Sequence, residues 1–108
     1  MSAVAIDNVL EALADPARRR TIDLLRSGPH RAGELARALR ISAPLMSRHL
    51  SVLRRCGLVL GELSDADARV RLYRLRPQAL AGLRRWLDAL DAHWERQLAA
   101  FKAHVEGP

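Results

Sequence analysis

One segment of the chain has a polar side that could contact nucleic acid. Between residues 42 and 56, Met46, Leu50 and Leu53 recur at helical spacing and predict a buried helix face. On the opposite side, a guanidinium could donate two hydrogen bonds to the acceptors of guanine in a DNA major groove. We therefore expect Arg48 to read a base. The side of this helix opposite the buried face consists of Pro44, Arg48, Ser51 and Arg55.

The remaining reactive side chains offer little chemistry. The single cysteine, Cys56, excludes an intramolecular disulfide and a zinc site built from several cysteines, and we interpret it as a buried structural thiol. We recognise no paired nucleophile and base, no glycine-rich phosphate loop and no pair of acids at a cleft. The sequence therefore predicts no catalytic residue, no cofactor and no enzyme.

The positive charge is concentrated in the middle of the chain. Residues 1–15 contain three acidic and no basic side chains, whereas residues 16–76 contain 14 basic and five acidic ones, a net charge of +9. Residues 77–108 contain four of each. Cations that neutralise phosphates release counterions, so this distribution is typical of a DNA-binding region. The run from Arg18 to Arg20 is interpreted as a solvated helix face.

The start of the chain lacks the features of a secretory signal. Asp7 and Glu11 stand where such a signal places basic residues before an apolar run, and no segment approaches the length of a membrane span. A lone cysteine also fits a reducing compartment. We expect a cytoplasmic protein without a membrane partner.

Prolines and glycines divide the chain into short elements whose apolar spacing predicts their type. Residues 58–60 and 70–75 flank a polar link and predict a β-hairpin. In chain order, we expect a helix near 6–13, a helix from Pro16 with Asp15 as its N-cap, a helix over 32–39, a helix capped by Ser42 that ends near Cys56, the hairpin, and a long helix from Pro77.

This order is that of a winged helix-turn-helix domain, a mainly α fold with a small β-hairpin. A helix of this kind fits the major groove, and a hairpin can lie along the neighbouring backbone. We expect a single domain over residues 1–108. Its parts are an N-terminal dimerisation helix in 1–15, a DNA-binding core with wing in 16–76, and a C-terminal dimerisation helix in 77–108.

The last helix carries an apolar stripe, and the core of so small a chain can cover little of it. Apolar residues step by three or four from Leu83 to Val105. Pairing with a second copy in a symmetric dimer would bury them. The expected dimer interface comprises Ile6, Val9, Leu10, Leu13, Leu83, Trp86, Leu87, Leu90, Trp94, Leu98, Phe101 and Val105.

Several segments, in the right order, resemble the ArsR-type family of dimeric bacterial repressors. They are ALADPARRRTIDLL, AGELARAL, SAPLMSRHLSVLRRCGLV and RLYRL, within residues 9–76, and the tail resembles a branch without the known metal ligands. The resemblance implies a homodimeric, sequence-specific repressor of its own or neighbouring genes that binds an inverted-repeat operator in double-stranded DNA. It also implies that DNA is faced by Ser42, Ala43, Ser47, Arg48 and His49 and by the wing residues Arg69 and Arg71.

Two departures from the family pattern affect the residues expected to face DNA. Ala43 stands where many members have Gln, and its methyl group cannot hydrogen-bond a base. The tip of the wing is acidic, with Glu62, Asp65 and Asp67. We therefore expect the wing to contact phosphate only through Arg69 and Arg71, or hardly at all. These departures support an alternative, a protein-interaction module that keeps the fold but has lost DNA binding.

A metal-sensing repressor is a further alternative. Asp91, His93 and His104 resemble the D-x-H-x10-H spacing of the family's zinc-type sensors. The two histidines are three helical turns apart and share one flank, so an antiparallel partner helix could complete a tetrahedral site. The fourth ligand does not fit, because Gly107 stands at its position and Glu106 is one residue early. We therefore expect no metal site.

Overall fold

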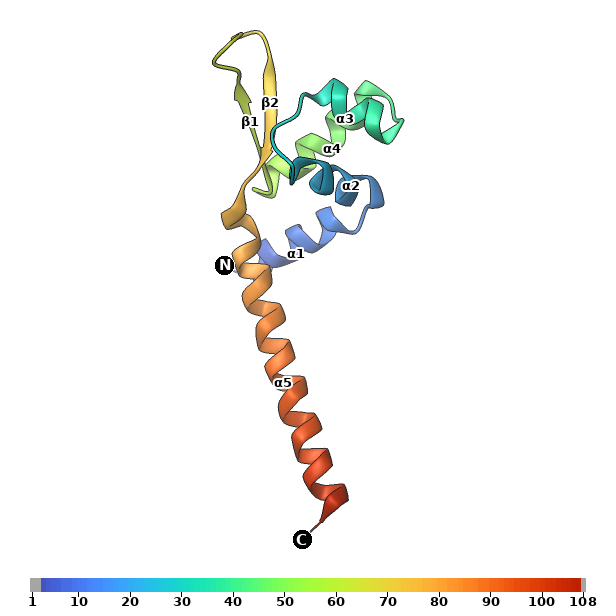
Figure 1. Cartoon of the computed structure of the whole chain (residues 1–108), viewed down its shortest axis with the longest axis vertical. Coiled ribbons are helices and arrows are strands. Elements are labelled where there is room, and N and C mark those ends of the chain that lie inside the picture. The colour runs from blue at the N-terminus through green and yellow to red at the C-terminus, as the bar shows by residue number, and fades with distance from the viewer. Residues whose placement is uncertain (1–2, 108) are drawn as a thin grey trace.

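The computed structural model describes residues 3–107, a mostly helical chain with one two-stranded antiparallel sheet (Figure 1). Its elements are α1 (Ala3–Leu13), α2 (Pro16–Leu25), α3 (Ala32–Leu39), α4 (Ala43–Arg55), β1 (Val59–Leu63), β2 (Arg71–Leu75), a 3-10 turn (Pro77–Leu80) and α5 (Ala81–Glu106). The winged helix-turn-helix is confirmed, with α3 and α4 as the helical pair and β1 and β2 as the wing. No helix in the described range is long and apolar enough to cross a membrane.

One apolar core lies where α1 to α4 meet the base of the wing. Leu35 of α3 and Met46 and Leu53 of α4 have no exposed surface. Leu58 and Val59, at the start of the hairpin, are buried in the same cluster. Burying one such side chain contributes roughly 1.5–3 kcal/mol of transfer free energy, so this core fixes α4 firmly against the wing.

Side-chain caps set where α2 and α4 begin, as the sequence predicts. The Asp15 carboxylate accepts hydrogen bonds from the N–H groups of Ala17 and Arg18 at 2.8 and 3.2 Å. The Ser42 hydroxyl oxygen accepts one from the N–H of Leu45 at 3.2 Å. Each cap satisfies backbone donors that the first helical turn leaves free. The N-terminal ends of both helices are therefore fixed by local interactions.

The cap at Asp15 predicts a pH-dependent contribution to stability. Burial raises the pKa of Asp15, but the hydrogen bonds from the Arg18 and Ala17 N–H groups outweigh it and hold the pKa below its ordinary value. The stabilisation is therefore fully present above the unfolded-state pKa of about 3.9 and is lost as the pH falls through the lower folded-state pKa. We expect Asp15→Ala to lower the free energy of unfolding by about 1 kcal/mol at pH 7, measured by urea denaturation.

Asp15→Asn is the matched control, because Asn also caps helices but carries no charge. It should retain most of the stability at pH 7. Below pH 4 the wild type should lose its advantage over Asp15→Ala, and the Asn variant should not. Equal stability of the wild type and Asp15→Ala at pH 7 would contradict the role of this cap.

Two arginines fasten the end of α1 to the start of α2. Arg18 Nε donates to the carbonyl of Ala12 at 2.6 Å, and an Arg19 guanidinium N–H donates to the carbonyl of Leu13 at the same distance. These carbonyls belong to the last turn of α1, which has no helical donors for them. The interpretation of this run as a solvated face is therefore wrong for Arg18, which is half-buried, whereas Arg20 is exposed.

The wing is tied to the helical core by the loop between α2 and α3. His30 and Tyr73 exchange two backbone hydrogen bonds, of 3.0 and 2.8 Å, so that the loop pairs with β2. Within the hairpin Gly61 faces Tyr73, and a Cβ atom on Gly61 would lie 3.2 Å from the tyrosine ring. The absence of a side chain at this position lets the ring pack across β1. The hairpin is thus held at both its base and its middle.

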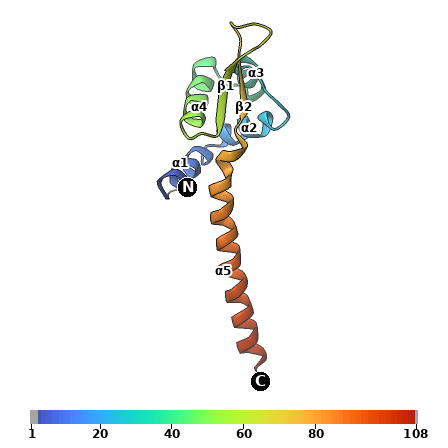
Figure 2. The ribbon, with the colours of Figure 1, turned by 90° about the vertical axis from the view of Figure 1, so that its left-hand side faces the viewer.

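The long helix α5 projects from this core (Figures 1 and 2). The molecule measures 70 × 26 × 25 Å, and its radius of gyration is 19.0 Å, whereas a compact domain of this length has about 13 Å. Large apolar side chains remain exposed along α5, including Leu98 at 63% and Phe101 at 66%. Within one protomer, most of α5 therefore has nothing to pack against.

Three observations bear on the expectations about α1 and the last helix. Val9, expected in the dimer interface, is 1% exposed in the core of its own protomer, because α1 packs against α2. Leu83 is half-buried against the same core, where α5 begins. The segment from Pro77 starts as a 3-10 turn, and the α-helix begins only at Ala81.

Candidate nucleic-acid interface

The outer side of α4 is exposed, as the sequence predicts. Met46, Leu50 and Leu53 point into the core, which turns the opposite side of the helix to solvent. Among the described residues, no ion pair engages Arg48, so its guanidinium is available to a ligand. The expected DNA-facing residues that are exposed on this helix and its cap are Ser42, Ala43, Pro44, Ser47, Arg48, Ser51 and Arg55.

His49 does not belong to this exposed side. It is only 7% exposed, and its Nδ1 atom lies 3.4 Å from a guanidinium nitrogen of Arg18. His49 is thus largely covered, because it lies next to Leu50 on the flank of α4 that packs towards α2, and its expected DNA contact stays a prediction. Since Arg18 also bonds the end of α1, this contact links the N-terminal helix to α4.

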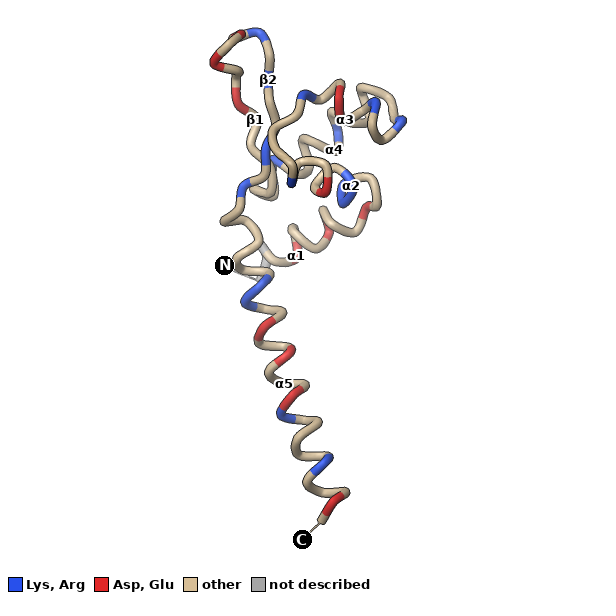
Figure 3. Tube along the Cα trace, in the orientation of Figure 1, with Lys and Arg blue, Asp and Glu red and all other residues tan. Residues whose placement is uncertain are grey.

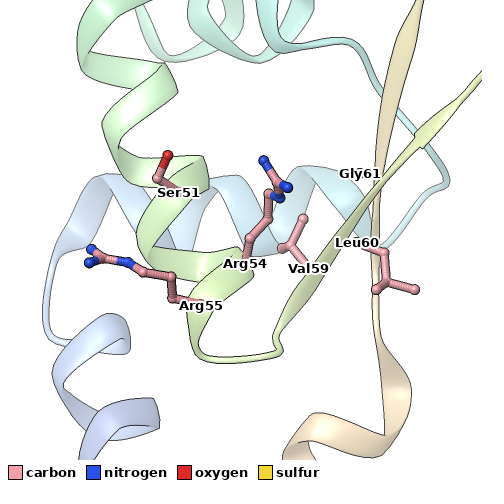
Figure 4. Close-up of a pocket in the computed structure, with 6 residues that line it drawn as sticks. All are labelled: Ser51, Arg54, Arg55, Val59, Leu60 and Gly61. Atoms are coloured by element: carbon pink, nitrogen blue, oxygen red, sulfur yellow. The ribbon is translucent and has the colours of Figure 1, made fainter.

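A cleft of about 480 Å³ separates the second half of α4 from β1, and Figure 4 shows the side chains that line it. Arg54 extends into the space between the helix and the strand, while Arg55 points to the other side of α4. A guanidinium in such a cleft can donate to a phosphate oxygen while the helix contacts bases. The role of Arg54 could not be assigned from the sequence, because it depends on how β1 packs beside the helix.

Most of the positive charge of the wing is paired with its own acids. Arg69 contacts Asp67 at 3.2 Å, and Arg74 contacts Glu62 across the strands at 2.7 Å. The hydrogen bonds from these arginines lower the pKa of both carboxyl groups, which keeps the pairs charged at neutral pH. Figure 3 shows acidic and basic residues side by side in this hairpin. In the described residues, Arg71 is an exposed wing arginine without an ion pair.

The residues weighed as metal ligands are not brought together in one protomer. In residues 3–107, no three His, Cys, Asp or Glu side chains are close enough to share a metal ion. His93 and His104 are both exposed on α5, and Glu106 lies 3.9 Å from Lys102, one turn away. A site that uses these residues would need a second copy of the helix.

Cys56, at the end of α4, is half-buried rather than fully buried. Its thiol donates to the carbonyl of Asn8 in α1 at 3.4 Å. The expectation of a structural thiol agrees with this contact between two helices.

Comparison with known proteins shows to which family the chain belongs. The sequence profile described as "Bacterial regulatory protein, arsR family" matches residues 15–60, which run from the cap of α2 to the start of β1. Over 100 residues the chain is 42% identical to the HTH-type transcriptional regulator Rv2034 of Mycobacterium tuberculosis (strain ATCC 25618 / H37Rv), which covers 93% of this chain and 88% of that protein. The chain belongs to the arsR family of bacterial regulatory proteins.

Two further relatives of this arsR-family protein bear on assembly and activity. The transcriptional repressor SdpR of Bacillus subtilis (strain 168) is 39% identical over 54 residues, half of this chain and 60% of that protein. The solution structure of Mb0332 from Mycobacterium bovis, described as a homodimeric winged helix-turn-helix DNA-binding domain, aligns with a TM-score of 0.64 and 26% identity. That alignment covers 85% of this chain and 83% of the Mb0332 fragment.

Proposed function

We propose that this arsR-family protein is a homodimeric transcriptional repressor that binds an inverted-repeat operator in double-stranded DNA. The observation that carries the proposal is the exposed side of α4. In the described part of the chain Arg48 has no ion pair there, and Arg54 lines the cleft between this helix and the wing. Family membership and the named relatives support the same function. We propose that the protein acts by binding rather than by catalysis, and that it acts on the chromosome in the cytoplasm.

Each part of the interface has a different role in this proposal. Arg48, in the middle of the outer side, enters the major groove and donates to a base. Ala43, at the start of the helix, contacts a thymine methyl group, because a small apolar side chain reads that group better than it reads a polar base edge. Arg54 and Arg55 bind phosphates, and the wing adds Arg71 and, when its pair with Asp67 opens, Arg69.

A symmetric dimer sets the geometry of the operator. Two α4 helices related by a two-fold axis reach successive major grooves when they lie about 34 Å apart, one turn of B-form DNA. The half-sites should therefore be inverted repeats with centres about 10 base pairs apart, or a multiple of this spacing.

Protection mapping of the DNA upstream of the gene tests the proposal directly. We expect a footprint over an inverted repeat, and the same footprint with or without added zinc. Release from the DNA on addition of zinc would replace the proposal with the metal-sensing alternative. Protein that is folded by circular dichroism but protects no DNA would favour the protein-interaction alternative.

The central positive charge predicts a strong dependence of binding on salt. Residues 16–76 carry a net charge of +9, and each phosphate neutralised releases counterions. For a dimer that makes several phosphate contacts, a plot of log affinity against log salt concentration should have a slope of roughly −4 to −8. Fluorescence anisotropy with operator DNA between about 50 and 300 mM salt measures this slope. A flat response would count against DNA binding.

A further inference from the structure

In the link between β1 and β2, a carboxylate holds the side chain of a wing arginine. The backbone N–H of Arg69 donates to Oδ1 of Asp67 at 3.0 Å, its Nε donates to the same oxygen at 3.2 Å, and its Nη2 donates to Oδ2 at 3.3 Å. Nε and Nη2 form one edge of the guanidinium, and each meets a different carboxylate oxygen. An arginine binds two oxygens of a phosphate in the same way. Asp67 therefore occupies the position on Arg69 that a phosphate would take.

We propose that Asp67 takes the place of a DNA phosphate on Arg69 in the free protein, and that the wing binds DNA by exchanging one anion for the other. This inference rests on the proposed DNA binding and assigns a residue that weakens it. A phosphate at the other edge of the guanidinium would still meet the charge of Asp67, because the carboxylate lies 3.2–3.3 Å from the same group. At either edge, Asp67 opposes the contact between Arg69 and DNA.

The turn of the wing fixes the acid and leaves the arginine free to move. The N–H of Val70 donates to the carbonyl of Asp67 at 3.0 Å, and the N–H of Ser64 donates to the carbonyl of Val70 at 2.8 Å. The side chain of Asp67 is 40% exposed, whereas that of Arg69 is 90% exposed. The exchange therefore needs only the arginine side chain to turn from the carboxylate to a phosphate.

A second cation favours an anion at the position of Asp67. The hydrogen bonds from Arg69 lower the pKa of Asp67, burial opposes them, and the charge of Arg31 lowers the pKa further. Arg31 directly precedes α3 and follows His30, whose backbone pairs with β2. Positive charge from the wing and from the start of α3 thus acts on one position. A DNA phosphate that replaced Asp67 there would be attracted by both arginines.

The other ion pair of the wing lies on a different side of the hairpin. Arg74 pairs with Glu62 and stands opposite Leu60 in the register of the two strands. Figure 4 shows Leu60 on the side of β1 away from Arg54 and the cleft beside α4. Since residues that face each other in a hairpin project to the same side of the sheet, Arg74 also lies away from that cleft. Releasing Arg74 should therefore add little to DNA binding.

Asp67→Asn should strengthen binding to the operator and to a scrambled sequence alike. Asn keeps a side-chain oxygen for the N–H of Arg69, so the turn should remain, but it lacks the charge that competes with a phosphate. Exposed ion pairs are weak, so releasing two of them in a dimer should raise the affinity for each DNA about three- to thirtyfold. The ratio of the two affinities should not change, because a phosphate contact carries no sequence information.

The dependence of binding on salt should change as well. In the wild type, Arg69 displaces a counterion from the DNA, but the released carboxylate of Asp67 attracts a cation in return. The exchange then contributes little to the salt dependence. Without the acid, the slope of log affinity against log salt concentration should become more negative by about 0.9 for each protomer.

Two other acids of the wing provide matched controls, since Asp65→Asn and Glu62→Gln remove the same charge. Asp65 is exposed, and in the described part of the chain it forms no ion pair. Replacing Glu62 releases only Arg74. Each control should raise the affinity for DNA less than about twofold at 0.1 M salt, where charges more than about 10 Å apart are screened. Fluorescence anisotropy measures the affinities and slopes, and thermal unfolding verifies that each variant is folded.

The same substitutions in an Arg69→Ala background test whether Asp67 acts through this arginine. There, Asp67→Asn should raise the affinity no more than Asp65→Asn does, because no arginine remains to be released. A larger gain from Asp67→Asn that persists without Arg69 refutes the exchange. So does a gain in the wild-type background no greater than that of Asp65→Asn. In all these cases the wild type still binds the operator, whereas a wild type that binds neither DNA refutes the proposed function itself.

Discussion

Trp94→Asp should convert the protein into a monomer at micromolar concentration and weaken operator binding by at least about 100-fold. The indole is 59% exposed in one protomer and lies in the middle of the α5 stripe. In a dimer, an aspartate here would be buried against the partner helix without a counter-ion, at a cost of about 3–5 kcal/mol. Since 1.4 kcal/mol is a factor of ten in affinity, the dissociation constant of the dimer should rise about 100-fold or more.

Operator affinity should fall when the dimer dissociates, because a monomer binds only one half-site. Sedimentation equilibrium and a gel-shift titration measure the two effects separately. Ala103→Asp is the matched control, since it adds the same charge to the same helix on the side away from the stripe. It should keep the dissociation constants of the dimer and of the operator complex within about twofold of the wild-type values, as expected for a surface substitution. A wild-type monomer that binds one half-site tightly would refute the dimer.

The local elements could be predicted because their signals are local. The helix expected over residues 32–39 has those bounds, and Asp15 and Ser42 cap the helices that follow them. A cap needs only a side-chain oxygen two or three residues from the donors that it satisfies. The inward residues of α4 were predicted for the same reason, since helical spacing places Met46, Leu50 and Leu53 on one side.

Contacts between distant segments could not be predicted from spacing. His49 lies beside the apolar face of α4, and only the position of α2 shows that Arg18 covers it. The pair of Arg74 with Glu62 depends on the register of the hairpin, which a seven-residue link between the strands does not determine. Reasoning from the sequence therefore overestimated the exposure of His49 and the unpaired positive charge of the wing.

The predicted dimer interface shows a related limit. Helical spacing tells which residues of α1 and α5 share a side, but not whether that side packs within the protomer or against a partner. Val9 belongs to the core of its own protomer, whereas Leu98 and Phe101 are exposed. The structure resolves this difference, because α5 leaves the core soon after Leu83.

Arg48→Ala should reduce specific operator binding by about 1–3 kcal/mol at each half-site, and so by up to about 6 kcal/mol for a dimer. Arg48 is exposed on the outer side of α4, and in the described residues no acid pairs with it. Removing a side chain so placed should leave the core intact, so thermal unfolding should be unchanged. Fluorescence anisotropy with the operator and with a scrambled sequence measures the specific part of the affinity.

Two control variants separate base reading from the effect of charge alone. Arg48→Lys keeps the charge but loses the two-pronged donor geometry, so it should bind scrambled DNA like the wild type and discriminate the operator less well. Arg85→Ala removes one charge from α5, outside the proposed interface, and should change operator affinity only slightly. If Arg48→Ala instead lowers binding to both DNAs equally, Arg48 contacts a phosphate rather than a base. Base recognition must then come from Ala43 and the serines of α4, because the structure places no other arginine in the middle of the outer side of that helix.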